Sequence, residues 1–432
     1  MIALVSLALL VSGAVRALAP RDRAFRAAAA ALAFGVWCSA LGAGVLLQAR
    51  TAVDLACALA GAALWLIPWR ADAPQAAGRA SWPMRALVFV NVAGAAAGFI
   101  ATAHAFPDGG WDATMMWNLR ARFFAGDPQP LQLVFDRALY HSGYPLLVSG
   151  GVARLWILFG ERSWAPLALG VAFAAACALS LWAFARKCAS PAAACLAAAL
   201  LLGAPLFARI AAWQYADVPL ALWVLLAVAF SAYGAERGEP RAYAAAGLAA
   251  GLGAWTKNEG LLLFLCLAAA VPLCAPRELR WRAMANFAAG ALPLLALVAG
   301  FKLSPYPRTN YLFADQTRAI ALHKLADFGR WVEIAKAFAE QPFSPRRWGF
   351  GFWAVVPVLL LRLLRRGGAW TPVEKHSWTT AGLALLGYFP VYLITTWTLQ
   401  LHLETSLDRL YLHIYPAALL AFSAGIARLN AP

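Results

Sequence analysis

Charged residues are scarce in this sequence. Only 13% of its 432 residues are Asp, Glu, Lys or Arg, whereas 62% are hydrophobic. Soluble globular proteins carry about 25% charged and roughly 45–50% apolar residues. This composition excludes a soluble globular protein, and we expect an all-α polytopic membrane protein.

Acidic residues are the scarcer charge, with 20 against 36 basic residues and a net charge of +16. In a soluble protein this excess would suggest nucleic-acid binding. Here the basic residues gather in short connections between apolar runs, which is typical of the positive-inside rule. We therefore expect no nucleic-acid partner. These connections include RDRAFR (21–26), RK (186–187), RELRWR (277–282) and RLLRR (362–366).

The sequence also lacks a metal or disulfide signature. Its seven cysteines lie in or beside apolar runs, and neither a CxxC nor an HExxH spacing occurs. No disulfide framework or zinc motif is therefore predicted. We expect no certain cofactor and leave a divalent metal open.

The first apolar run, MIALVSLALLVSGAVRALAP, has no basic residue before Arg16. A signal peptide carries its positive charge before its apolar region. We therefore expect an uncleaved span whose N-terminus lies outside the cytoplasm.

About 13 apolar runs are candidate transmembrane helices, because a span needs roughly 20 apolar residues. If they alternate in direction, the basic connections all lie on one side, which we take as cytoplasmic. The runs lie at 1–19, 27–48, 52–68, 86–106, 164–185, 191–208, 217–234, 243–256, 260–274, 283–303, 349–364, 377–398 and 409–427. The predicted organisation is N-terminal helices (1–85), a catalytic core (86–303) with its first outer loop at 107–163, an outer segment (304–348) and C-terminal helices (349–432).

Two apolar stretches in the outer segments are not counted as spans. Crossing by residues 144–160 would switch the side of every later basic loop, so we expect an interfacial or re-entrant helix there. In residues 317–340 the apolar side chains would form one face of a helix and the charged side chains the other, which predicts an amphipathic helix on the membrane surface.

The first outer segment opens with FPDGGWDATMMWNLRARFF (106–124), which places Asp108 and Asp112 at the end of an apolar run. The two acids share a face if the segment is helical, and do not if the PDGG turn interrupts the helix. Partial burial beside Trp111 and Trp117 would raise a carboxylate pKa and suit a general base. Both acids are candidate catalytic residues.

Other ionisable residues stand at span ends, where each has a structural alternative. Asp217 is either a site residue or a helix N-terminal acid that complements the helix dipole. Lys257 and Glu259 either form a hairpin ion pair or bind substrate, the lysine through a lipid phosphate. Arg120 and Arg409 either anchor their helices at the interface or bind phosphate.

Three further residues, His141, Tyr144 and Glu404, join Glu259 as candidate substrate-binding residues.

Four stretches resemble the GT-C superfamily of membrane glycosyltransferases, in particular protein mannosyltransferases and lipid A aminoarabinose transferases. The resemblance covers about 86–427 and leaves 1–85 outside. The stretches are GGWDATMMWNLRARFF, HSGYPLLVSGGVARLWILFGERSWAP, RIAAWQYADVPLALWVLL with GLAAGLGAWTKNEGLLLF, and DRLYLHIYPAALL.

The resemblance implies transfer of a sugar from a polyprenyl-phosphate donor to an envelope glycan, lipid or protein. The reaction would take place at the periplasmic face of a bacterial inner membrane. The family's first-loop acid corresponds to Asp112, or else to Asp108, and its second outer acid to Asp217. Its loop lysine corresponds to Lys257 and its late arginine to Arg409. Many members have an adjacent Asp-Glu pair where this chain has WDA, which leaves the choice of base and any metal open.

Two other classes remain as alternatives. A transporter or lipid flippase predicts ionisable residues near mid-membrane and repeat symmetry, and no convincing repeat is present. A non-catalytic envelope scaffold would tolerate the joint loss of Asp108, Asp112 and Asp217.

Overall fold

A computed structural model describes residues 2–18, 23–66, 78–126, 131–136, 139, 141–304, 316–365 and 369–430. Its regular elements in these ranges are all helices, which confirms the all-α expectation. They are α1 (Ile2–Leu18), α2 (Arg23–Leu46), α3 (Arg50–Leu64), α4 (Trp82–Ala105), η1 (Ala113–Trp117), α5 (Asn118–Ala125), α6 (Leu131–Val134), α7 (Leu147–Phe159), α8 (Trp164–Cys188), α9 (Pro191–Leu202), α10 (Pro205–Ala212), α11 (Asp217–Arg237), α12 (Pro240–Thr256), α13 (Asn258–Cys274), α14 (Arg280–Leu303), α15 (Arg318–Ala326), α16 (Phe328–Glu340), η2 (Gln341–Phe343), α17 (Pro345–Trp348), α18 (Gly351–Leu364), α19 (Pro372–Ile394) and α20 (Leu399–Leu429).

Fewer helices are long enough to cross a membrane than the sequence predicts. Each of the thirteen apolar runs coincides with a helix, and the chain is a multi-pass membrane protein. Within the described ranges, however, only seven helices are long and apolar enough to cross a membrane, or eight if α9 and α10, bent by 57°, form one span. Several of the other helices are shorter, such as α3 with 15 residues and α18 with 14. The count of thirteen is therefore not confirmed.

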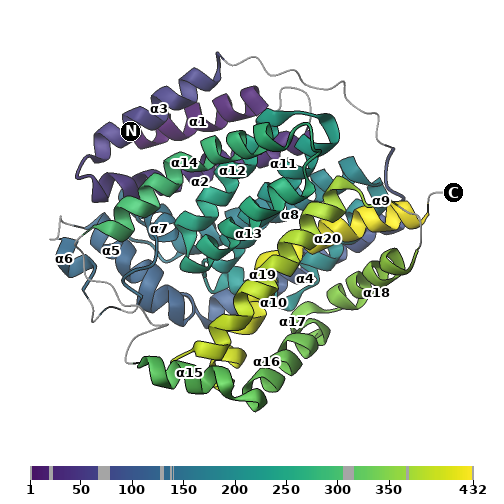
Figure 1. Cartoon of the computed structure of the whole chain (residues 1–432). Helices are drawn as coiled ribbons and strands as arrows, with labels where there is room; N and C mark the ends of the chain where they lie inside the picture. Colours follow the sequence, from purple (N-terminus) through teal and green to yellow (C-terminus); the bar gives the residue numbers. More distant parts are fainter. Residues whose placement is uncertain are drawn as a thin grey trace.

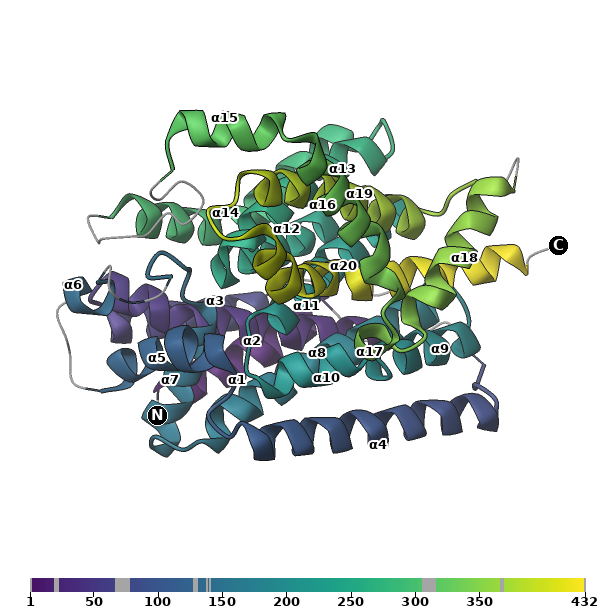
Figure 2. The same ribbon diagram turned by 90° about the horizontal axis from the view of Figure 1, so that it is seen from below.

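Two helices, α11 and α20, form the centre of the bundle. In these helices 94% and 89% of the most apolar window is buried, and they pack against each other. Helix α11 also packs against α8 and α12 (Figure 1). By contrast, α4 lies along the outside against α9 and α10, with none of its window buried (Figure 2). Polar residues on α11 and α20 are therefore held in the most enclosed part of the protein.

The N-terminal helices α1, α2 and α3 pack on one another, and α2 also packs on α7 and α8. Helix α7 corresponds to the apolar stretch at 144–160. It has 13 residues, most of them buried, which is short for a span. The domain boundaries and the re-entrant placement of α7 stay predictions.

The amphipathic stretch at 317–340 is two helices rather than one. Asp327 divides α15 from α16, because its side chain accepts a hydrogen bond from the backbone N–H of Arg330 at 3.2 Å and caps α16. Apolar side chains such as Phe328 and Val332 stay exposed. The expected contact of this segment with the membrane surface stays a prediction.

Candidate active site

A glycine turn after α4 holds Asp112 at the start of η1. Gly109 has a φ of 87°, and the Gly110 N–H donates to the carbonyl of Trp213 at 3.1 Å. A Cβ at Gly110 would collide with the ring of Tyr215, so the close approach requires glycine. The turn separates Asp108 from Asp112. Asp108 is exposed, whereas Asp112 is 6% exposed at the start of η1.

A break between two helices positions Lys257. This residue is extended, with φ −159° and ψ 157°, and it joins α12 directly to α13. The two helices pack against each other so closely that a Cβ at Gly260 would collide with the carbonyl of Gly253. The Lys257 side chain is buried, and its Nζ lies 2.9 Å from Asp217 Oδ1 and 3.0 Å from Glu259 Oε1.

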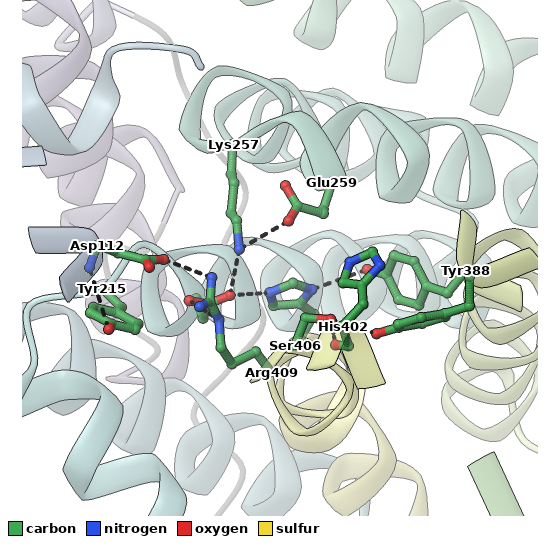
Figure 3. Close-up of polar contacts among 11 residues, drawn as sticks. Asp112, Tyr215, Lys257, Glu259, Tyr388, His402, Ser406 and Arg409 are labelled. Atoms are coloured by element: carbon green, nitrogen blue, oxygen red, sulfur yellow. Dashed lines mark hydrogen bonds and ion pairs between the residues drawn. The ribbon is translucent and has the colours of Figure 1, made fainter. Parts of the chain in front are cut away.

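Arg409 connects the two aspartates. It lies in the first half of α20, which begins at Leu399 and so includes residues 399–408, the polar stretch between the apolar runs 377–398 and 409–427. Its Nη2 donates to Asp112 Oδ2 at 2.8 Å, and its Nε lies 3.2 Å from Asp217 Oδ2 (Figure 3). Its guanidinium also lies over the ring of Tyr215, with 5.0 Å from Cζ to the centroid.

We call Asp112, Asp217, Lys257, Glu259 and Arg409 the charged cluster. It brings together three carboxylates and two cations from four parts of the chain. The side chains of Asp217 and Lys257 are 0% and 1% exposed, so they form its closed interior. The side chains of Asp112, Arg409 and Glu259 are 9%, 16% and 26% exposed and form its accessible edge. A reactant would therefore meet Asp112, Arg409 and Glu259 first.

A buried pair behind the cluster orients Asp217. His413 Nε2 lies 2.8 Å from Asp217 Oδ1, and His413 Nδ1 lies 3.0 Å from the Tyr388 hydroxyl. A carboxylate accepts only, so a neutral His413 carries its proton on Nε2 and accepts from Tyr388 through Nδ1. Tyr388 and His413 are 1% and 0% exposed, so each depends on the other for its hydrogen bond.

We expect His413→Ala to destabilise the protein by about 1–3 kcal/mol, because Tyr388 and Asp217 each lose a buried partner. Tyr388→Phe leaves only the buried His413 Nδ1 acceptor unpaired, whereas His413→Ala leaves two groups unpaired, so its cost should lie at the low end, about 1 kcal/mol. Thermal unfolding in detergent measures both, with His323→Ala on exposed α15 as the control. Equal midpoints for His413→Ala and His323→Ala would contradict this role.

Asp112 has the electrostatics of a group that can exchange a proton. Burial raises its pKa above the usual 3.8, and the nearby positive charge of Arg409 partly offsets this. Its backbone N–H donates to the Tyr215 hydroxyl at 3.4 Å. Burial raises the pKa of Tyr215 to about 12, so this hydroxyl stays protonated at neutral pH.

Three of the predicted site residues form a support beside the cluster. Arg120 is buried and donates to the carbonyls of Tyr144 and His141, both at 2.9 Å. The Tyr144 ring stacks on His141 at 4.6 Å and on Trp117 at 5.7 Å between centroids. Burial lowers the pKa of His141 to about 4, so its imidazole is neutral. Phosphate binding by Arg120 and substrate contact by His141 and Tyr144 stay predictions.

Two predicted residues lie outside the cluster. Asp108 is exposed in the glycine turn, and its carbonyl accepts from Asn118 at 3.2 Å. Glu404 is exposed on α20 and accepts from Gln400 at 3.0 Å. Their catalytic and substrate-binding roles also stay predictions.

The structure adds Tyr215, Tyr388 and His413, which the sequence reasoning left out of the site. The sequence offered a reason to consider two of them. Tyr215 is two residues before Asp217, and His413 is four residues after Arg409, which places both side chains on one face of a helix. Tyr388 had none, because its approach depends on the packing of α19 against α20.

Metal binding stays open. Among the described residues, no three His, Cys, Asp or Glu side chains are grouped to hold a metal ion. Asp112 and Asp217 are each engaged by Arg409.

Residues 151–301 match the family model of dolichyl-phosphate-mannose-protein mannosyltransferase. No curated protein and no solved structure matches the chain. The matched segment is about a third of the chain and contains Asp217, Lys257 and Glu259, whereas Asp112 and Arg409 lie outside it. Over this segment the chain is similar to the dolichyl-phosphate-mannose-protein mannosyltransferase family, part of the GT-C superfamily of membrane glycosyltransferases.

Proposed function

We propose that this protein moves a sugar from a polyprenyl-phosphate donor to an envelope acceptor, which is lipid A, a polysaccharide, a protein or a lipid. The reaction takes place at the periplasmic face of a bacterial inner membrane. The observation that carries the proposal is the contact of Asp112 with Arg409 at the accessible edge of the charged cluster. It pairs a carboxylate of raised pKa with a cation beside apolar helices.

Arg409 suits the phosphate of a lipid donor. Its guanidinium is permanently charged and presents several N–H donors in one plane, which match phosphate oxygens. The flanking helices are apolar and suit the polyprenyl tail. Arg409 is already paired with Asp112. A bound phosphate would compete for the same guanidinium, which weakens its hold on the Asp112 carboxylate and makes that carboxylate a better proton acceptor.

In the proposed reaction Asp112 takes the proton from the acceptor nucleophile. The nucleophile forms a bond to the anomeric carbon as the bond from that carbon to the phosphate oxygen breaks. The polyprenyl phosphate leaves with the electron pair, and the configuration at the anomeric carbon inverts. Arg409 stabilises the negative charge that develops on the leaving phosphate.

The closed interior of the cluster supports this edge. Asp217 is held by Lys257 and His413 and so keeps the Nε side of Arg409 in place. Lys257 adds positive charge for the phosphate and orients Glu259, which is accessible enough to contact a sugar hydroxyl. The outer segment 304–348 would cap or select the acceptor; its residues 305–315 lie outside the described part of the chain.

Mass spectrometry of envelope glycans and lipid A from a deletion strain tests the function. We expect one sugar mass to disappear and to return with the wild-type gene. Membranes that hold the protein should also transfer that sugar from a lipid-linked donor without any ion gradient. An unchanged glycan profile together with no gradient-free transfer would contradict the proposal and favour transport.

A further inference from the structure

A second polar site lies beside the charged cluster and contains none of its residues. It is a pocket of about 290 Å³ lined by parts of the segments that position Asp112, residues 107–118 and Gln214, together with the α7–α8 turn. We propose that this pocket binds a neutral sugar ring of the acceptor. The inference rests on the proposed function and names the class of acceptor.

Two buried amides form the inner wall of the pocket. Asn118 Nδ2 donates to Gln214 Oε1 at 2.7 Å, and Gln214 Nε2 donates to the carbonyl of Pro107 at 3.3 Å. Asn118 is 6% exposed, yet its Oδ1 has no hydrogen-bond partner among the described residues. A buried acceptor without a partner is costly, so the surrounding structure must hold the Asn118 amide in this position.

The backbone at Gln214 is also unusual. Its φ is 61°, in the left-handed region, which non-glycine residues seldom adopt. Such conformations cluster at ligand sites, where the surrounding structure holds them in place. Gln214 directly precedes Tyr215, whose hydroxyl accepts from the backbone of Asp112. The pocket and the proposed base therefore share one support.

The charges of the pocket favour a neutral ligand. Its charged residues are two acids, Asp108 and Glu161, and two bases, Arg122 and Arg162. Arg122 Nε is paired with Glu161 Oε1 at 2.7 Å. A phosphate would lie among two carboxylates, whereas sugar hydroxyls can donate to carboxylates and amide oxygens and accept from amide and guanidinium N–H groups.

The size and apolar surface of the pocket agree with a single ring. Ligand pockets for drug-sized molecules range over roughly 300–1,000 Å³, so this one is at the small end. Trp156 and two prolines, Pro107 and Pro166, add apolar surface between the polar groups. A lipid tail would find too much polar surface here.

Ligand-observed NMR on the purified full-length protein tests the pocket. The probes are the methyl glycosides of glucose, galactose, mannose, N-acetylglucosamine and arabinose. Thr114→Trp fills the pocket from one wall, and Ser163→Trp fills it from another if the first variant fails to fold. Ala285→Trp, on an exposed face of α14, is the matched control.

We expect at least one glycoside to bind the wild type and Ala285→Trp alike, with dissociation constants at least tenfold weaker in Thr114→Trp. Binding of none of the glycosides, or equal binding by Thr114→Trp, would overturn the inference. If glycosides bind as expected but no sugar transfer is found, the pocket stands and the proposed function fails. If transfer is found with an acceptor KM that Thr114→Trp leaves unchanged, the function stands and the pocket assignment fails.

Discussion

Replacing Asp112 by Asn is expected to lower the turnover of sugar transfer by about 10²- to 10⁴-fold, the usual contribution of a general base. Asn keeps the shape of the side chain and can still contact Arg409, so the fold should survive. The measurement is single-turnover transfer from a lipid-linked donor at matched expression. Glu278→Gln, which neutralises an exposed acid in the connection before α14, is the control and should behave as wild type.

Asp108→Asn tests which of the two acids, Asp108 or Asp112, is the base. Because Asp108 lines the pocket and does not reach Arg409, its loss should raise the KM for the acceptor more than it lowers turnover. A large loss of turnover in Asp108→Asn with full activity in Asp112→Asn would reverse the assignment of the base.

The pH profile offers a further measure of Asp112. A general base acts in its ionised form, so transfer should fall as the pH drops through the pKa of this carboxyl. Burial raises that pKa, so the acid limb of turnover should lie above the usual carboxyl value of 3.8. The same limb should vanish in the residual activity of Asp112→Asn.

The sequence predicted the helical class and named all five residues of the charged cluster as candidates, because both depend on local patterns. Apolar runs mark helices wherever they lie, and an acid or base at the end of such a run stands out against its surroundings. Lys257 and Glu259 interrupt an apolar stretch, and the structure does break the helix there.

What the sequence could not predict depends on packing between distant segments. The contact of Asp112 with Arg409 joins residues 297 positions apart. The hydrogen bond from Tyr388 to His413 depends on how α19 meets α20. Residues 399–408 fall between two predicted apolar runs, yet they form the first turns of α20, because helix propensity and burial of every third or fourth side chain outweigh their polarity.

Arg409→Gln is expected to abolish transfer and to destabilise the protein by about 3–5 kcal/mol, because breaking a buried ion pair leaves a charge uncompensated. The cluster would then hold three carboxylates against Lys257 alone. Thermal unfolding in detergent and transfer from a lipid-linked donor measure the two effects separately. Arg428→Gln, at the far end of the same helix, is the matched control.

The double variant Arg409→Gln with Asp112→Asn distinguishes stability from catalysis. Removing both partners takes away the Asp112 charge that Arg409 balanced and leaves Asp217 and Glu259 with Lys257, so part of the lost stability should return. Transfer should not return, because both the proposed base and the proposed phosphate ligand are absent. A double variant that is no more stable than Arg409→Gln would show that Asp112 does not depend on Arg409 for its charge. A double variant that transfers sugar would show that the chemistry takes place elsewhere in the protein.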